Sequence, residues 1–393
     1  MKVLCLIDNL GSGGAQRQLA TLSVLLKKQG MDVSVLTYHP QDFFLPLLRE
    51  GGVGYTCLES RSPWRRMAAI RRILRTGDHD VVLAFLDGPV LYAELAAIPW
   101  RHWGLVVSER NAVPSTTHSY MAWLRQFHRL ADYITTNSHT NRLMVERAVP
   151  ALKGRMVTIY NAVDLDAFTP AQVPRNRDAR RFQMAVAASY WHQKNPALFI
   201  EGIALARKLL PEVDIRLDWY GRSPRGKDGT LDTTVYDEAS RMVQTHGLQG
   251  CVRLNPDRSP IQEVYCDADA VALPSLYEGL PNTICEAMAC GRPVLMSHVC
   301  DAGNMVQDGH NGFLFDPLSP EAMAVAICKM AGLAPEAREA MGANGRQMAE
   351  RMFDPAVVAG HYTHVLQAAA ARKRVHLEHW VPSTPESALQ SLM

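Results

Sequence analysis

The segment Ala270–Met296, which reads AVALPSLYEGLPNTICEAMACGRPVLM, constrains the fold more than any other part of this chain. Two short apolar runs enclose a stretch of good helix formers, which starts after Pro281 and ends at Gly291. The order strand, loop, helix, turn, strand predicts a βαβ unit with parallel strands. The chain should therefore contain a parallel α/β sheet, with this loop and the start of the helix at its carboxyl edge.

The predicted carboxyl edge has the features of an anion site. Free N–H groups and the helix dipole at a helix N-terminus attract negatively charged ligands. Two carboxylates, Glu278 and Glu286, flank this helix start. A ligand with both phosphates and hydroxyl groups, such as a nucleotide sugar, would use the helix start and the carboxylates together.

Length and composition limit the other possibilities. The chain has 393 residues, which suggests two domains of about 150–200 residues each. A net charge of +2 gives no reason to expect a nucleic-acid partner. The first apolar run, Val3–Ile7, is too short for the core of a signal peptide, and no apolar stretch approaches the ~18 residues that span a bilayer. The eight cysteines form no C-x-x-C pair, which indicates reduced thiols, a cytoplasmic location and no structural zinc.

Apolar and amphipathic segments alternate over the whole chain and predict two doubly wound, Rossmann-like α/β domains. We place the first domain at 1–168, a polar linker at 169–182, the second domain at 183–354, a final helix at 355–371 and a disordered tail at 372–393. Strands are predicted at Val3–Ile7, Val33–Thr37, Val81–Leu86, Leu105–Ser108, Tyr133–Asn137 and Val157–Tyr160, and then at Met184–Ala188, Ile215–Tyr220, Val252–Leu254, Ala270–Leu273, Val294–Met296 and Phe313–Phe315. Two such domains that face each other leave a cleft between their strand ends, which is the default ligand site.

Two further loops follow predicted strands and could meet a phosphate. In the first, Gly13 and Gly14 could approach a ligand, but Gln16 occupies the third glycine position of a dinucleotide fingerprint. A tight strand-to-helix turn explains that loop equally well. In the second, Lys194 follows the first strand of the second domain, and this position favours a diphosphate contact over an ordinary solvated lysine.

The segment SLYEGLPNTICEAMACGRPV resembles the E-x7-E signature of the retaining glycosyltransferases of family 4, which have the GT-B fold. Further segments agree with this family in their order along the chain: SGGAQR at 12–17, TNSH at 136–139, IYNAVDLDAFTP at 159–170, HQKN at 192–195 and DGHNGFLF at 308–315. The resemblance covers nearly the whole chain apart from the tail.

The resemblance implies roles for the residues at the matching positions. Glu278 would contact hydroxyl groups of the donor sugar, Glu286 the ribose, and Lys194 would neutralise the diphosphate. The final helix would cross back onto the first domain. The implied backbone contacts are to the distal phosphate at Asn282 and Thr283 and to the base near Arg253 and Leu254.

Two positions depart from the family pattern. An arginine is common five residues before the lysine, where this chain has Ser189, and Arg222 could supply the missing positive charge. Many members carry a histidine after the fourth strand of the first domain. Here that segment reads Ser-Glu-Arg-Asn, and we expect Arg110 and Asn111 to make the sugar contact.

The reaction needs no metal ion. Cleavage of the sugar–phosphate bond leaves negative charge on the diphosphate, which Lys194 and the helix amides can stabilise. A carboxylate near the sugar could stabilise the positive charge of an oxocarbenium-like transition state. The D-x-D pairs at 164–166 and 267–269 fit structural turns better than a metal site. We expect no metal and no cofactor, because the nucleotide sugar is a substrate.

One predicted helix is rich in arginine. The segment Arg61–Arg75 holds six arginines, which alternate with apolar residues. Such a face could bind an anionic membrane, where each cation near the surface contributes about 1 kcal/mol. The segment Trp100–Trp103 could add a neighbouring contact. A packed helix with one solvated face is the alternative.

We therefore predict a retaining glycosyltransferase that moves a hexose or N-acetylhexosamine from a nucleotide-diphosphate donor, a UDP-sugar, to a saccharide acceptor. By resemblance, the acceptor is lipid-linked and the setting is cell-surface polysaccharide assembly at the cytoplasmic face of the membrane. Two alternatives stay open. One is a glycosidase that uses Glu278 and Glu286 as its carboxylate pair. The other is a non-catalytic protein that binds a nucleotide sugar, an idea motivated by Ser189 and Glu109.

Overall fold

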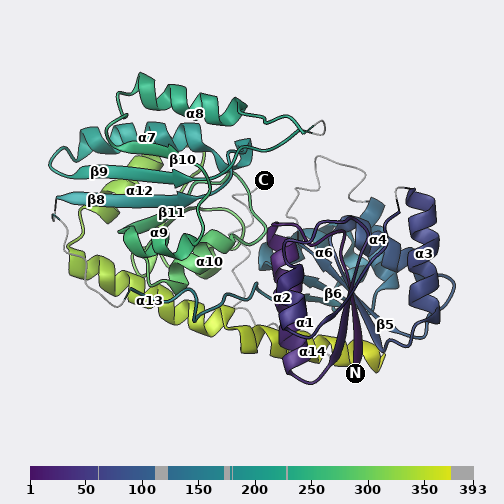
Figure 1. The fold of residues 1–393 in the computed structure, drawn as a ribbon. Coiled ribbons are helices and arrows are strands. Elements are labelled where there is room, and N and C mark those ends of the chain that lie inside the picture. The colour runs from purple at the N-terminus through teal and green to yellow at the C-terminus, as the bar shows by residue number, and fades with distance from the viewer. Residues whose placement is uncertain (61, 111–122, 172–177, 179, 227–228, 373–393) are drawn as a thin grey trace. The chain divides into compact units, whose positions relative to one another are not determined.

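The computed structural model describes residues 1–60, 62–110, 123–171, 178, 180–226 and 229–372. Arg61, Asn111, part of the predicted linker and the predicted tail beyond Arg372 lie outside the described residues. The chain forms two compact units, each a parallel sheet with helices (Figure 1). Unit 1 comprises residues 1–162 and the C-terminal segment that begins at Met352, and unit 2 comprises residues 163–351.

Unit 1 is built on a parallel sheet whose described strands follow the order β3-β2-β1-β4-β5-β6-β7. The chain winds outward from β1 to β3 and then returns to β4 on the other side of β1. The strand order therefore reverses between β1 and β4. The elements of unit 1 are β1 (Lys2–Leu6), α1 (Gly14–Lys28), β2 (Asp32–Thr37), α2 (Leu45–Glu50), β3 (Gly54–Cys57), α3 (Pro63–Thr76), β4 (Val81–Phe85), α4 (Asp87–Ala96), β5 (Gly104–Glu109), the 3₁₀ helix η1 (Gln126–Leu130), β6 (Tyr133–Thr136), α6 (His139–Ala148), the 3₁₀ helix η2 (Pro150–Leu152), β7 (Met156–Thr158) and α14 (Pro355–Ala370).

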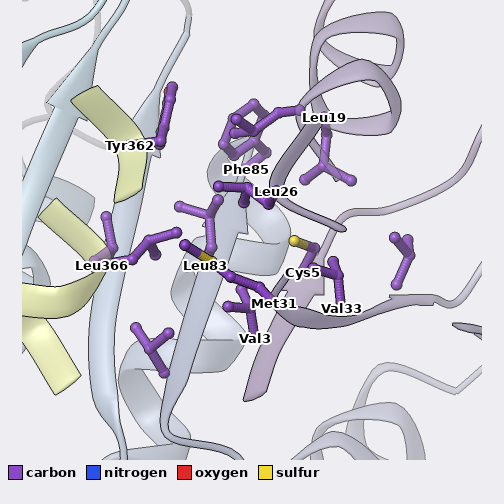
Figure 2. Packing of buried hydrophobic residues seen from close by; sticks show 14 of the residues in the cluster. Val3, Cys5, Leu19, Leu26, Met31, Val33, Leu83, Phe85, Tyr362 and Leu366 are labelled. Atoms are coloured by element: carbon purple, nitrogen blue, oxygen red, sulfur yellow. The ribbon is translucent and has the colours of Figure 1, made fainter. Parts of the chain in front are cut away.

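Hydrophobic cores cover both faces of this sheet. Successive side chains of a strand point to opposite faces, so Val3 of β1 joins one core and Leu4 joins the other. The core that contains Val3 includes Leu19 of α1 together with Tyr362 and Leu366 of α14, as Figure 2 shows. The predicted return of the final helix to the first domain is therefore confirmed.

The sheet of unit 1 contains one strand that the sequence analysis missed. β3 has four residues, alternately half-buried and exposed, and lies at the edge of the sheet beside β2. An edge strand of this length needs no continuous apolar run, because it has a neighbour on one side only.

Unit 2 is built on a second parallel sheet, with the strand order β10-β9-β8-β11-β12-β13. Here the order reverses between β8 and β11. Figure 1 shows α7 and α8 on one side of this sheet and α9 and α10 on the other. The elements of unit 2 are β8 (Arg181–Ala187), the 3₁₀ helix η3 (His192–Lys194), α7 (Pro196–Leu209), β9 (Asp214–Tyr220), α8 (Thr234–Thr245), β10 (Val252–Asn255), α9 (Ile261–Asp267), β11 (Ala270–Leu273), α10 (Asn282–Ala289), β12 (Val294–Ser297), α11 (Ala302–Met305), β13 (Gly312–Phe315), α12 (Pro320–Ala331) and α13 (Pro335–Phe353), whose last residues belong to unit 1.

The chain leaves unit 1 after Ala162 and enters unit 2 at Val163, which lies before the predicted linker at 169–182. The side-chain amide of Gln18 donates to the carbonyl oxygen of Ala162 and accepts from its N–H, both at 3.0 Å, which attaches Ala162 to unit 1. Arg346 of α13 donates to the carbonyl oxygens of Leu165 and Phe168 at 3.2 and 2.7 Å, which attaches these residues to unit 2. Such long-range hydrogen bonds leave no local signal in the sequence.

Gly221, directly after β9, is the position where backbone packing should be least tolerant. A methyl group on its Cα would lie 2.0 Å from the carbonyl oxygen of Ala188, which follows β8. Gly221→Ala should therefore lower the free energy of unfolding by about 2 kcal/mol, because one of the two backbones must move. Gly250→Ala is the matched control, since a methyl group there meets nothing within 4 Å. Denaturant titration of both variants measures the difference, and equal stability would contradict the close approach.

Candidate functional site

The loops that follow β8 and β11 meet at the point where the strand order of unit 2 reverses. In doubly wound sheets, ligands bind at this point, in the crevice outside the carboxyl ends of the strands. Lys194 at the end of η3 and Glu278 in the loop after β11 form an ion pair there. Their side chains are 21% and 10% exposed, so the pair is largely shielded from water. The structure thus brings together two residues that the sequence assigns to one donor site.

Backbone hydrogen bonds hold these two loops against each other. The N–H of Leu276 donates to the carbonyl oxygen of Gln193 at 2.8 Å. The side-chain amide of Gln193 donates to the carbonyl oxygen of Tyr277 at 2.6 Å. Asn195 adopts a left-handed backbone conformation with φ 56°, which ends η3 and lets α7 start at the next residue. The two charged side chains therefore project from fixed backbone positions.

The helix α10 contributes the second glutamate and the helix start. Glu286 is 7% exposed, and its Oε2 accepts a hydrogen bond of 3.2 Å from the hydroxyl of Tyr265. Burial and the neighbouring Glu286 carboxylate raise the pKa of Tyr265 well above its ordinary value. Thr283 Oγ1 donates to the carbonyl oxygen of Ala187 at 2.8 Å, which joins the first turn of α10 to the end of β8. Glu278 and Glu286 thus have different surroundings, one paired with an ammonium and the other with a phenol.

The first turn of α10 has the character of an anion site. Its N-cap is Pro281, whose side chain makes no capping hydrogen bond, and the first turn contains no acidic residue. Asn282 and Thr283 are the first two residues of the helix. The N–H groups of a first helical turn and the helix dipole favour a negatively charged ligand at this end.

The remaining residues predicted for the donor lie beside this point, on β10 and after β9, the strands next along the sheet from β8. Arg222 follows β9, is exposed, and its Nε lies 3.8 Å from Asp257 Oδ2. Leu254 belongs to the edge strand β10, opposite Trp219 of β9. Whether Arg222 replaces the arginine absent at Ser189 stays a prediction.

Sequence reasoning missed Tyr190, which connects three loops of this edge. Its ring stacks on Trp219 with the ring centroids 6.1 Å apart. Its hydroxyl donates to the carbonyl oxygen of Asn255 at 3.1 Å, and its N–H donates to that of Arg222 at 3.0 Å. Tyr190 thereby ties the loop after β8 to the ends of β9 and β10. An aromatic residue next to the predicted strand end was the available signal.

In unit 1 the glycine-rich loop lies at the corresponding reversal of strand order. Gly13 is the N-cap of α1 and Gly14 is the first residue of that helix. Asn9 Oδ1 accepts from the N–H of Gly11 at 2.7 Å, which shapes the turn. The tight strand-to-helix turn is therefore present, and contact of Gly13 and Gly14 with a ligand stays a prediction.

Arg110, which we predicted to contact the sugar, points into the interior of unit 1. Its Nη1 donates to Asn161 Oδ1 at 2.6 Å and its Nη2 to the hydroxyl of Tyr362 at 2.8 Å. The guanidinium carbon lies 4.2 Å from the centroid of the Phe85 ring. Burial lowers the pKa of Arg110. In this structure Arg110 fastens α14 to the end of β5.

A buried group of charges surrounds the end of β5 on its other face. His128 lies between two carboxylates, with Nδ1 2.6 Å from Glu94 Oε1 and Nε2 2.9 Å from Glu109 Oε1. Arg125 Nε donates to the same oxygen of Glu109 at 3.1 Å. Burial lowers the pKa of His128, but the hydrogen bonds to Glu109 and Glu94 outweigh burial and raise it to about 10. The spacing of His128 in the sequence gave no sign of this group.

The carboxylates of the D-x-D pairs make hydrogen bonds to backbone. Asp164 Oδ1 accepts from the N–H groups of Asp166 and Ala167 at 3.2 and 3.0 Å. Asp269 Oδ2 accepts from the N–H of Gln183 at 2.7 Å. Within the described ranges, no group of three or more His, Cys, Asp or Glu residues could hold a metal ion.

The arginines of α3 divide into two groups. Arg66 Nη2 donates to the carbonyl oxygen of Ser60 at 2.7 Å, and Arg71 Nη1 donates to that of Leu95 at 3.0 Å. Arg75 Nη1 donates to the carbonyl oxygen of Ile98 at 3.0 Å, and its guanidinium lies 4.8 Å from the centroid of the exposed Trp100 ring. These three arginines are part of the packing of unit 1, whereas Arg65 and Arg72 are exposed.

Comparison with known proteins connects both units to one class. Residues 12–167 match the family model described as Glycosyltransferase Family 4, and residues 181–332 match the one described as Glycosyl transferases group 1. The chain is 29% identical over 184 residues to the D-inositol 3-phosphate glycosyltransferase of Arthrobacter sp. (strain FB24), a match that covers 42% of each chain. This chain thus spans about two fifths of that relative's length.

A second relative matches over most of its length. It is the GalNAc-alpha-(1->4)-GalNAc-alpha-(1->3)-diNAcBac-PP-undecaprenol alpha-1,4-N-acetyl-D-galactosaminyltransferase of Campylobacter jejuni subsp. jejuni serotype O:2, 25% identical over 328 residues. The match covers 80% of this chain and 84% of the relative.

Solved structures agree with the predicted fold class. The crystal structure of Anabaena Alr3699/HepE in complex with UDP and glucose has a TM-score of 0.77 at 18% identity and covers 94% of this chain and 100% of its own. Sucrose-phosphate synthase from Thermosynechococcus elongatus has a TM-score of 0.76 at 18% identity, covering 94% and 99%. The fold is the GT-B fold of two Rossmann-like units.

The buried charges around His128 make the stability of unit 1 depend on pH. The folded pKa of about 10 lies above the ordinary value of 6.5, so the folded chain keeps a proton that the unfolded chain loses. The free energy of unfolding should therefore fall as pH rises from 6.5 to 8, by on the order of 1 kcal/mol per pH unit. His128→Gln should remove this slope, and His39→Gln, at an exposed position of the same unit, should keep it. Urea titrations at several pH values measure the slope, and an unchanged slope in His128→Gln would refute the assignment.

Proposed function

This chain belongs to glycosyltransferase family 4, and we propose that it transfers a sugar from a UDP-sugar to a saccharide acceptor. The observation that carries the proposal is the ion pair of Lys194 and Glu278 in the loops at the reversal of strand order in unit 2, the second of which leads into α10. A sugar diphosphate needs positive charge for its phosphates and hydrogen-bond acceptors for its hydroxyl groups. This carboxyl edge of the sheet offers both the positive charge and the hydrogen-bond acceptors.

We assign each part of the donor to a residue type that suits it. Lys194 and the first amides of α10 neutralise the diphosphate and the charge that develops on it as the sugar departs. Glu278 accepts hydrogen bonds from the sugar hydroxyls, and Glu286 accepts from the ribose. Because Glu286 is almost fully buried and already holds the Tyr265 hydroxyl, it is oriented before the ligand arrives. Preorganised acceptors cost little rearrangement on binding.

We further propose that the anomeric configuration is retained and that no metal ion takes part. Retention follows from membership of the family. An ammonium and a helix start supply the positive charge that a divalent cation would otherwise bring to a diphosphate. The base specificity for uracil is supported by the neighbouring structure in complex with UDP.

The acceptor is proposed from the relatives. One relative's name specifies an undecaprenol-linked saccharide, and the other specifies D-inositol 3-phosphate. Both names contain an acceptor that carries phosphate. We propose a lipid-linked saccharide and a role in cell-surface polysaccharide assembly, with a hexose or N-acetylhexosamine as the transferred sugar.

A membrane-linked acceptor would require unit 1 to approach a membrane surface. No helix in the described ranges is long and apolar enough to cross a bilayer. We propose peripheral binding through α3 and the neighbouring turn, where Trp64 and Trp100 are 85% and 65% exposed and Arg65 and Arg72 point outward. Tryptophan and arginine together suit the interface between lipid headgroups and acyl chains. The three arginines that bond backbone carbonyls contribute less to such binding.

Substitutions in the donor site test the proposed activity. Lys194→Ala and Glu286→Ala should each lower the rate of transfer at least about 100-fold, because charge stabilisation or donor orientation is lost. Lys208→Ala, at an exposed position of α7, is the matched control and should leave the rate unchanged. The measurement is nucleotide released from a panel of UDP- and GDP-sugars, in the presence of lipid-linked and soluble saccharide acceptors. Wild-type transfer in both variants would refute the assignment, and sugar release without an acceptor would favour a hydrolase.

Vesicle binding tests the proposed membrane contact. Trp64→Ser together with Trp100→Ser should weaken binding to vesicles that contain anionic lipid by about tenfold or more, because two exposed indoles no longer enter the interface. Leu318→Ser, at a position of unit 2 that is 70% exposed, is the control. Co-sedimentation with vesicles of phosphatidylcholine and phosphatidylglycerol measures the binding. Equal binding of both variants would locate the contact elsewhere or exclude it.

A further inference from the structure

The ammonium of Lys194 has a counterion within the protein itself. In this structure the counterion is the carboxylate of Glu278. In the proposed function, by contrast, Lys194 holds the diphosphate and Glu278 holds sugar hydroxyls. Two anions thus draw on one ammonium, and a diphosphate bound at Lys194 would weaken its pairing with Glu278.

The exchange can take place without movement of the backbone. The loops that carry the two residues are joined by the hydrogen bonds of Gln193 to Leu276 and Tyr277. The residue after the lysine, Asn195, is held by a 2.7 Å hydrogen bond from its Nδ2 to the carbonyl oxygen of Pro317. Only side-chain torsions of Lys194 and Glu278 need to change. A pair exchange of this kind therefore has a low conformational cost.

The ion pair is shielded enough from water for its attraction to influence the binding of a ligand. Exposed pairs contribute little, because water and salt screen them, but a pair with 21% and 10% exposed side chains is partly desolvated. Separating such charges leaves each in need of a new partner. A sugar nucleotide provides both partners, since its diphosphate binds the ammonium and its hydroxyls bind the carboxylate. A nucleotide without a sugar provides only the first.

We propose that Glu278 lets the donor site distinguish the sugar nucleotide from the spent nucleotide, by competing with the diphosphate for Lys194 whenever no sugar occupies the carboxylate. The inference rests on the proposed function, because it takes the donor to be a sugar diphosphate bound at Lys194. After transfer, the sugar leaves Glu278 free to return to Lys194. The returning carboxylate weakens the hold on the diphosphate and favours release of the product.

The test is binding of UDP to the full chain with Glu278→Gln, measured by calorimetry. The neutral amide cannot hold Lys194 as an ion pair, so the affinity for UDP should rise about tenfold. Transfer from the UDP-sugar should fall in the same variant. Glu238→Gln, at an exposed position of α8, is the matched control and should bind UDP as the wild type does. If Glu278→Gln fails to fold, Glu278→Ala gives the same measurement.

A double-mutant cycle separates pair exchange from simple charge repulsion. If Glu278 only repels the diphosphate through space, Glu278→Gln should also tighten UDP binding in a Lys194→Gln background. If Glu278 competes for Lys194, the gain should disappear in that background, because no ammonium remains to be released. A gain of equal size in both backgrounds would overturn the proposal, as would unchanged or weaker UDP binding by Glu278→Gln alone.

Failure of the inference can be told apart from failure of the proposed function. If the wild type binds neither UDP nor GDP, the proposed donor class is wrong and the inference falls with it. If the wild type binds UDP and Glu278→Gln gains no affinity, the donor class stands and only the competition is refuted.

Discussion

The ion pair between Lys194 and Glu278 depends on one topological fact, and so does the position of the residues that we propose for the donor. β8 and β11 are neighbours in the sheet, although the chain visits β9 and β10 between them. Because all pairings are parallel, the loops that follow β8 and β11 begin side by side at the carboxyl edge. The hydrogen bonds of Gln193 then hold the two loop backbones together. The ammonium of Lys194 and the carboxylate of Glu278 attract each other across these loops.

The supporting parts of this edge are polar groups with assigned partners. Thr283 joins α10 to the end of β8, Tyr265 orients Glu286, and Tyr190 joins the loop after β8 to those after β9 and β10. A buried hydroxyl with a partner adds stability and direction, whereas one without a partner costs the full loss of its hydration. The same groups that stabilise unit 2 therefore set the orientation of the residues that we propose for the donor.

Unit 1 uses buried charge in a comparable way, with a different result. The imidazolium of His128 and the guanidinium of Arg125 balance the carboxylates of Glu94 and Glu109 beneath the end of β5. On the opposite face, Arg110 joins β5 to α14. These charges hold the strand end and the last helix in place. Their structural role limits what Arg110 can offer to a ligand, because its donors on Nη1 and Nη2 already have partners.

Much of the fold could be predicted from the sequence, because local patterns carry it. The predicted strand Ala270–Leu273 has the bounds that the structure gives it, and the predicted final helix at 355–371 differs from α14 by one residue, since prolines and apolar runs mark both. β3 was missed because an edge strand with half-exposed residues has no such marks. The surroundings of Arg110 and His128 were also missed, because their hydrogen-bond partners are 19 to 252 residues away in the sequence.

By itself, the sequence determined that two parallel α/β units exist and that Lys194, Glu278 and Glu286 lie at a carboxyl edge. Period, turn residues and helix starts are local, so these conclusions need no knowledge of strand order. Only the tertiary structure decided which side chains meet. Lys194 forms an ion pair with Glu278, and the hydroxyl of Tyr265 donates a hydrogen bond to Glu286. The guanidinium of Arg110 lies inside unit 1, where it donates to Asn161. The physical reason is that charge and hydrogen-bond energies fall steeply with distance, and distances between remote residues are set by the order of strands in the sheet.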